Sequence, residues 1–273
     1  MIKVFVNGFK GRMGSGIVEA VSADSDFVVV GGYDPKAAEG TPVLVSVGVT
    51  PAPAVAAPVF RDLAEGLEAT KPDVMVDFTH PSAVAENIEI ALRHNIHCVV
   101  GTTGLAPDDL TALYERVPTS ANLFYAPNFT MGAVLMMACA QKVARYFADA
   151  EIIEFHHNGK ADAPSGTAIN TALAIASVRE QAGIRTTAPG KETELPGKEG
   201  ARGTSVQGVL VHSVRSDGFV AHQEVIFGSA GETLTIRHDS ISRSAYMPGI
   251  LLAIRSVPTR RGLIIGLDKL LDL

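Results

Sequence analysis

The sequence predicts an α/β protein in which a doubly wound parallel sheet is followed by an α+β domain with a mixed, open sheet. In the first half, short apolar runs alternate with helical patterns, which is how parallel sheets are built. After about residue 127, strand patterns follow one another with little helix between them. The 273 residues, 47% of them hydrophobic, are enough for two cores.

The first strand–helix–strand unit begins at once. Residues 2–6 form an apolar run, residues 8–14 are rich in glycine, and the apolar residues that follow have helical spacing. Residues 27–32 predict the second strand, which ends near Asp34. A strand, a glycine turn, a helix and a strand together indicate a right-handed crossover in a parallel sheet.

The alternation resumes after an irregular stretch. Residues 40–58 are rich in Val, Ala and Pro, and they predict a long connection with at most one irregular strand. Beyond it, the pattern predicts strands over residues 74–78, 97–100 and 123–125 and helices over residues 82–94 and 107–116. We therefore place the first domain at residues 1–127.

The second half has a different pattern of predicted helices and strands. It predicts helices over residues 131–147 and 166–178 and strands over residues 151–157, 209–214, 219–227 and 233–238. Residues 182–203 combine Gly, Pro and mixed charge and predict a loop. A helix over 245–257 and a strand over 263–265 are too small to fold alone. We expect residues 243–273 to complete the first domain, which leaves 128–242 as the second.

Composition restricts the function classes. The net charge of −6 and the pI of about 5.7 argue against a nucleic-acid partner. No apolar run approaches the ~20 residues of a membrane span, and the N-terminal residues lack the layout of a signal peptide. These features predict a cytoplasmic protein without a membrane partner. Cys98 and Cys139 lie in apolar runs, so we expect two buried thiols, with no disulfide and no metal site.

The glycine turn predicts a dinucleotide site of the Rossmann type. It has the spacing G-x-x-G-x-x-G, with Lys10 where the middle glycine of the usual motif stands. Asp34 lies where an acid can accept hydrogen bonds from ribose hydroxyls. Residues 101–104 and 126–129 follow two further strands, at the sheet edge where such ligands bind. The alternative is a structural glycine turn with ordinary turn chemistry.

A second cluster of functional residues lies between positions 154 and 168. His156 and Lys160 combine a proton donor with a compact positive charge, just ahead of a Pro-Ser-Gly-Thr helix start. A helix N-terminus attracts anions, so the segment is suited to protonating a small anionic substrate. Adjacent histidines on a strand point to opposite faces, so one of them can equally be structural. The sequence leaves open the roles of Asp162, His212, His222 and His238.

These motifs resemble one family along nearly the whole chain. The matching segments are residues 8–14, 77–79, 101–104, 126–129, 154–168, 212–215, 221–225, 231–232 and 236–240. The chain resembles the 4-hydroxy-tetrahydrodipicolinate reductase (dihydrodipicolinate reductase) family of lysine and diaminopimelate biosynthesis. The segment 154–168 is the most specific of these.

The resemblance implies an oxidoreductase that uses NADH or NADPH to reduce a cyclic, unsaturated dicarboxylate with loss of water. It implies that His156 is the general acid and Lys160 the catalytic lysine. It implies contacts to the substrate carboxylates from His157, Gly166 and Thr167. It also implies dinucleotide contacts from Gly8, Phe9, Lys10, Gly11, Arg12, Met13, Asp34, Gly101, Thr102, Thr103, Ala126, Pro127, Asn128 and Phe129. Finally, it implies a homotetramer joined through the second domain.

Two other functions fit parts of the pattern. A related two-domain dehydrogenase of an amino-acid substrate would keep the glycine turn but has no need of the 154–168 segment. A non-catalytic dinucleotide-binding regulator would tolerate loss of His156 and Lys160, and both are present. Lys10 departs from many family members, which bears on cofactor preference and not on the reaction.

Overall fold

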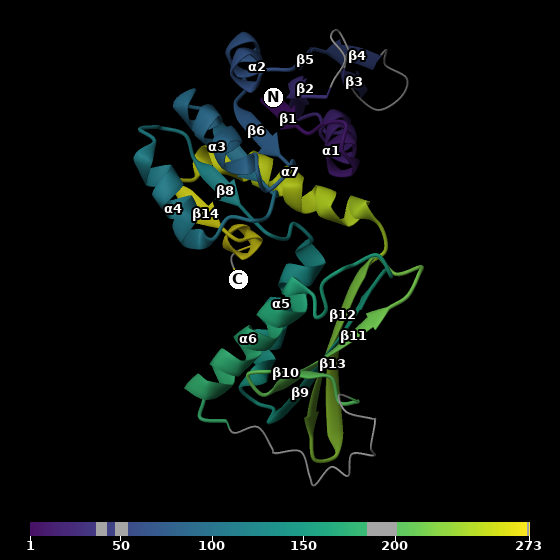
Figure 1. Cartoon of the computed structure of the whole chain (residues 1–273). Helices are drawn as coiled ribbons and strands as arrows, with labels where there is room; N and C mark the ends of the chain where they lie inside the picture. Colours follow the sequence, from purple (N-terminus) through teal and green to yellow (C-terminus); the bar gives the residue numbers. More distant parts are fainter. Residues whose placement is uncertain (37–42, 47–53, 185–200, 272) are drawn as a thin grey trace. The chain divides into compact units, whose positions relative to one another are not determined.

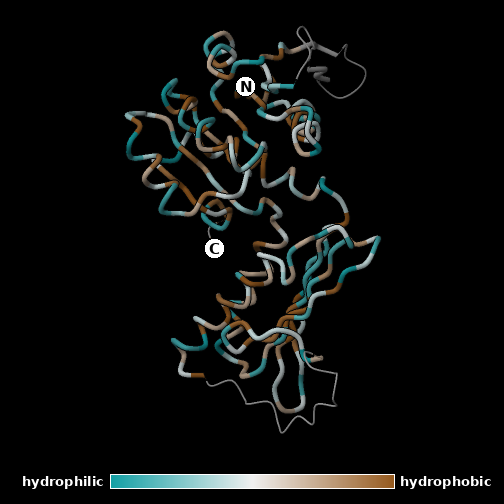
Figure 2. The backbone as a smooth tube through the Cα atoms, in the orientation of Figure 1, coloured by the Kyte–Doolittle hydropathy of each residue, from teal (hydrophilic) through white to brown (hydrophobic). Residues whose placement is uncertain are grey.

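The chain forms two compact units in the computed structural model, which describes residues 1–36, 43–46, 54–184, 201–271 and 273 (Figure 1). The first unit consists of Met1–Met131 and Arg243–Leu273, and the second of Gly132–Ser242. Hydrophobic residues are concentrated along the strands of both units and hydrophilic residues in their loops (Figure 2).

The first unit contains a seven-stranded parallel sheet with the order β14-β8-β7-β6-β1-β2-β5. Its strands are β1 (Ile2–Asn7), β2 (Phe27–Tyr33), β5 (Val59–Phe60), β6 (Val74–Asp77), β7 (His97–Val100), β8 (Leu123–Tyr125) and β14 (Leu263–Ile265). The chain winds outward from β1 in both directions, first through β2 and β5 and then through β6 to β8. The order therefore reverses beside β1, where open α/β sheets bind ligands.

Helices cover both faces of this sheet. They are α1 (Arg12–Ala23), α2 (Leu63–Thr70), α3 (Val84–Arg93), α4 (Pro107–Arg116) and α7 (Met247–Ser256). On one face, α2, α3 and α4 enclose a core that includes Phe5, Met75 and Leu92. Residues that alternate with these along the strands, such as Val4 and Val76, are also fully buried. Helices α1 and α7 pack on each other and on strands of the sheet. The doubly wound fold is confirmed.

The second unit is built on a five-stranded sheet with the order β10-β11-β9-β12-β13. Its strands are β9 (Asp149–His156), β10 (Thr204–Val206), β11 (Val209–Arg215), β12 (Ala221–Ser229) and β13 (Glu232–Ser240). Only β11 and β9 pair in parallel, so the sheet is mixed, as predicted. Helices α5 (Met131–Ala144) and α6 (Gly166–Gln181) cover one face, where Ala140 and Ile175 meet Ile152 and Val225.

The C-terminal segment lies in the first unit. Strand β14 extends the parallel sheet by pairing with β8. The helix expected over residues 245–257 is shorter, because 3₁₀ turns at Arg243–Tyr246 (η1) and Val257–Thr259 (η2) flank α7. A third 3₁₀ turn, Leu267–Leu270 (η3), follows the last strand.

The sequence analysis missed helix α2, although its start carries a recognisable signal. Asp62 caps the helix by accepting a hydrogen bond from the Glu65 backbone N–H at 2.8 Å. An acid at the cap with a glutamate three positions later is a common helix start. Gly66 in the middle obscured the pattern. It is needed there because a Cβ would lie 2.9 Å from the rings of Phe5 and Phe60.

Three other expectations need correction. Within residues 40–58, the described parts contain two antiparallel strands, β3 (Val43–Ser46) and β4 (Ala54–Ala57), where at most one was expected. Strand β10 was not predicted, and much of the loop expected over 182–203 lies outside the described residues. Cys98 is buried, but Cys139 is exposed. The reason is helical rotation, because Met136 and Ala140 face the sheet and residue 139 lies about 100° from Ala140.

Candidate active site

The predicted dinucleotide residues lie at one edge of the parallel sheet. The segments 8–13, 34, 101–103 and 126–129 directly follow β1, β2, β7 and β8, all of which end at the same edge.

None of the described helices combines the length and the apolar composition that a bilayer crossing requires.

The glycine turn fits a phosphate group. Gly8 has a φ of +74°, which favours glycine. Gly14 packs so tightly that a Cβ would lie 2.1 Å from the Gly8 carbonyl oxygen. Helix α1 follows Gly11, an N-cap residue that has no side chain to cap it, and its first turn has no acidic residue. Its free N–H groups are therefore available to an anion such as a pyrophosphate.

Side chains at this edge differ in what they can contact. Phe9, Ala126 and Phe129 are buried, so only their backbones can contact a ligand. Lys10 is exposed, and Asp34 is half-buried. One carboxylate oxygen of Asp34 accepts the Lys36 backbone N–H at 2.9 Å, which fixes the direction of the side chain.

The carboxylate of Asp77, which the sequence analysis noted only as part of a family motif, connects the loops at this edge. Asp77 is fully buried at the end of β6. Its Oδ1 accepts hydrogen bonds from the Thr102 hydroxyl at 2.6 Å and the Thr79 hydroxyl at 2.8 Å. Its Oδ2 accepts from the amides of Asn87 at 2.8 Å and Asn7 at 3.2 Å. The loops after β1, β6 and β7 are thus held to one another.

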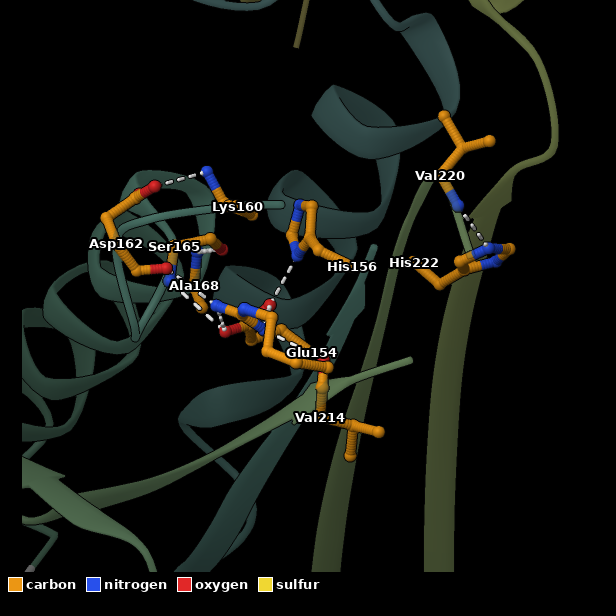
Figure 3. A network of polar contacts seen from close by, with 10 residues as sticks. Glu154, His156, Lys160, Asp162, Ser165, Ala168, Val214, Val220 and His222 are labelled. Atoms are coloured by element: carbon orange, nitrogen blue, oxygen red, sulfur yellow. Dashed lines mark hydrogen bonds and ion pairs between the residues drawn. The ribbon is translucent and has the colours of Figure 1, made fainter. Parts of the chain in front are cut away.

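The cluster predicted between residues 154 and 168 lies in the second unit (Figure 3). His156 ends β9, and alternation along the strand places Glu154 on the same face of the sheet. The Nδ1 atom of His156 lies 2.5 Å from Glu154 Oε2. The Glu154 side chain is fully buried, whereas that of His156 is 14% exposed. Glu154 therefore holds the ring at Nδ1, while the side chain stays partly accessible.

Arg215 completes an ion pair beneath the histidine. It is on β11, opposite His156 in the parallel register. Its two terminal nitrogens donate to the two Glu154 oxygens at 2.7 and 3.0 Å. Burial favours a raised pKa for Glu154, but hydrogen bonds from His156, Arg215 and Ser213 outweigh it and lower the pKa to about 2. Glu154 is thus ionised at neutral pH and can only accept hydrogen bonds.

Lys160 and the start of α6 flank the histidine. Lys160 Nζ lies 2.7 Å from Asp162 Oδ1, a contact that lowers the pKa of this exposed carboxyl. Helix α6 is capped by Ser165, whose hydroxyl accepts the Ala168 N–H at 3.3 Å. Gly166 is exposed, and a Cβ there would meet no atom within 4 Å. The helix start therefore has open space above its first N–H groups.

The remaining histidines make separate contacts. His157 is exposed next to the turn. His212 lies 2.8 Å from Glu151, and His222 lies 2.6 Å from Asp239, both on the sheet face opposite Glu154. Both rings are therefore on the other face of the sheet from His156.

This combination defines a class of protein. The first unit has the topology and the glycine turn of a dinucleotide-binding domain. The second presents an imidazole, an ammonium group and the N-terminus of a helix on one side of a sheet, which suits proton transfer to an anion. Together they are typical of two-domain, dinucleotide-dependent oxidoreductases.

Comparison with known proteins identifies the family. Residues 2–129 match the family model described as dihydrodipicolinate reductase, N-terminus, and residues 132–271 match the corresponding C-terminus model. The chain belongs to the dihydrodipicolinate reductase family.

Individual relatives agree over their full length. A curated 4-hydroxy-tetrahydrodipicolinate reductase from Enterococcus faecalis is 48% identical over 99% of this chain and 100% of its own length. One from Mycobacterium sp. (strain KMS) is 44% identical over all of both chains. The solved structure of a dipicolinate-bound dihydrodipicolinate reductase from Paenisporosarcina sp. TG-14 has a TM-score of 0.82 and 38% identity, covering 98% and 99% of the two chains.

More distant structures share only the fold. An amine dehydrogenase from Mycobacterium smegmatis has a TM-score of 0.61 at 16% identity, covering 98% of this chain and 95% of its own. At this identity the likeness shows a shared fold and nothing about activity.

Proposed function

We propose that this chain catalyses the reduction of 4-hydroxy-tetrahydrodipicolinate to tetrahydrodipicolinate by NADH or NADPH, with loss of water, in lysine and diaminopimelate biosynthesis. The observation that carries the proposal is the arrangement of His156, Lys160 and the start of α6 around one side of the second sheet. The curated relatives with this activity support it.

The two units take different tasks. We assign dinucleotide binding to residues 1–127 with 243–273, and substrate binding and oligomerisation to residues 128–242. When bound, the reduced nicotinamide supplies the hydride. The chain's residues bind the substrate carboxylates and supply a proton, so that one hydride and one proton add to the substrate system and one water leaves.

The substrate carboxylates find cationic and N–H partners in the second unit. Lys160 offers an ammonium group, and Gly166 and Thr167 offer the first N–H groups of α6. His157 is exposed nearby and can contact a second carboxylate. Because Glu154 holds Nδ1 of His156, the proton donor is Nε2 of the same ring in its imidazolium form.

Cofactor binding uses the sheet edge of the first unit. The N–H groups of Arg12 and Met13 at the start of α1 bind the pyrophosphate, and Asp34 accepts hydrogen bonds from the ribose hydroxyls. The segments 101–103 and 126–129 continue this surface beyond β7 and β8. Lys10 and Lys36 add positive charge near the ribose, so we expect both cofactors to be used.

An activity assay tests the proposal. Substrate generated in place by the synthase reaction should oxidise NADH or NADPH, followed by nicotinamide absorbance. His156→Gln and Lys160→Ala should each lower kcat at least ~10²-fold while NADH binding stays near wild type. Lys142→Ala, an exposed lysine on α5, is the matched control and should leave kcat unchanged. Full turnover by either site variant would contradict the assignment.

The proposal includes a homotetramer in the cytoplasm. The sheet face opposite α5 and α6 carries the apolar side chains Ile153, Phe155, Val214 and Ile226, which are only partly buried. A partner subunit would cover this face. Light scattering during size-exclusion chromatography should give a mass several times 28.6 kDa. A monomer at micromolar concentration would contradict this part of the proposal.

A further inference from the structure

One buried carboxylate connects segments that are far apart in the sequence. Both oxygens of Glu154 accept hydrogen bonds (Figure 3). Oε2 accepts from His156 Nδ1 and Arg215, and Oε1 accepts from Arg215 and the Ser165 backbone N–H at 3.3 Å. The Ser213 side chain donates to the same carboxylate, so its acceptor positions are all used.

The contact to His156 decides which ring nitrogen carries a proton. An ionised carboxylate only accepts, so Nδ1 must be the donor at 2.5 Å. Nε2 is then the nitrogen that faces away from the pair, and it is a proton donor in the imidazolium form, in which both nitrogens carry a hydrogen. An acceptor at Nδ1 also fixes the rotation of the ring.

The contact to Ser165 fixes the position of the helix start. Ser165 is the N-cap of α6, so Gly166 and Thr167 follow directly. A displacement of Glu154 would move the first N–H groups of the helix relative to the imidazole.

Arg215 extends the same network to Lys160. Its Nη2 atom donates to the Asp162 carbonyl oxygen at 2.7 Å, in addition to Glu154. The Asp162 side chain in turn lies 2.7 Å from Lys160 Nζ. The turn that carries the lysine is thus tied to the strand that carries the histidine.

We infer that the Glu154–Arg215 ion pair is a positioning device that holds His156, Lys160 and the α6 N-terminus in one geometry and presents His156 Nε2 as the proton donor. The inference rests on the proposed function for its kinetic part. Neither residue contacts the substrate in this account, so both act through the groups they hold.

The chain contains a natural control for this idea. Glu151 lies on the same strand, and it also accepts from a histidine and an arginine, His212 at 2.8 Å and Arg202 at 2.5 Å. Its side chain is 36% exposed, whereas Glu154 is fully buried. It faces the other side of the sheet, so Glu151→Gln changes the same chemistry without touching the network.

A neutron diffraction structure tests the geometric part without any activity measurement. We expect a deuterium on His156 Nδ1, between the ring and Glu154. A ring that carries deuterium on Nε2 alone would overturn the inference, whatever reaction the protein catalyses.

Kinetics test the positioning role. Glu154→Gln should lower kcat about 10- to 100-fold and raise the substrate KM, as loss of an orienting partner does. Its dissociation constant for NADH should change by less than about two-fold, because the dinucleotide edge is in the other unit. Glu151→Gln should keep kcat within about two-fold of wild type. An unchanged kcat in folded Glu154→Gln would overturn the inference and leave the proposed function intact.

A double variant separates positioning from folding. Glu154→Gln leaves Arg215 without its counter-charge, and this alone lowers the stability of the variant. Glu154→Gln/Arg215→Met removes both charges, so we expect its Tm to recover toward wild type while kcat stays low. Recovery of kcat together with Tm would show a purely structural pair and overturn the inference. Inactivity of the wild type with the substrate would instead contradict the proposed function.

Discussion

Replacing Gly166 by alanine separates the stability of helix α6 from substrate binding. Gly166 is the first residue of the helix, and its backbone is not in the left-handed region. A Cβ would meet no protein atom within 4 Å. The methyl group therefore costs the folded chain nothing sterically, and it lowers the entropy of the unfolded chain.

We expect the substitution to stabilise the fold and to weaken substrate binding. Glycine to alanine at a compatible site stabilises by about 0.4–1 kcal/mol, which corresponds to a rise of about 1–4 °C in Tm. The same methyl group would occupy the space above the N–H groups that bind the substrate carboxylate. Loss of one hydrogen bond to a charged group costs about 1.5–3 kcal/mol, so the substrate KM should rise roughly 10- to 100-fold.

Calorimetry and steady-state kinetics on one preparation measure both effects. Asn170→Ala is the control, because Asn170 is exposed one turn further along α6 and alanine is the better helix former. It should raise Tm slightly and leave KM unchanged. If Gly166→Ala raises Tm without changing KM, the start of α6 does not bind the carboxylate.

Three further predictions concern charges in both units. Lys10→Ala should weaken NADPH more than NADH, with a difference that shrinks as salt is added, and an equal effect on both cofactors would mean that Lys10 only shapes the turn. Asp77→Asn should lower Tm by several degrees, because the amide replaces one accepting oxygen by an NH2 donor that faces the hydroxyl and amide donors around it, at a cost of about 1–3 kcal/mol. An unchanged Tm would refute the network's role. The pKa of Glu154 is lowered from 4.5 to about 2 in the folded chain, so its ionised form stabilises the fold above pH 4.5, on the order of 3 kcal/mol, and this is lost as the pH falls toward 2. Denaturant unfolding should therefore show the stability difference between wild type and Glu154→Gln shrinking on acidification, and a constant difference would contradict the shift.

Local patterns in the sequence were sufficient for the fold class. Apolar runs and helical spacing predicted nearly every strand and helix of the parallel sheet, because these periodicities depend only on neighbouring residues. Helix α2 was missed because Gly66 interrupts its pattern, and the need for glycine there comes from the rings of Phe5 and Phe60. The exposure of Cys139 was misjudged because an apolar run does not show which side of the helix meets the sheet.

The candidate site also has a part that the sequence predicted and a part that only the tertiary structure showed. The sequence by itself brought His156, Lys160 and the start of α6 together, because they lie within a dozen residues and flank one turn. Only the tertiary structure joined Arg215 to Glu154, 61 positions away, because that contact depends on the parallel register of β11 against β9. The same holds for Thr102 and Asp77, which meet across neighbouring strands. Local periodicity specifies which elements form, whereas the pairing of distant strands decides which side chains share a buried charge.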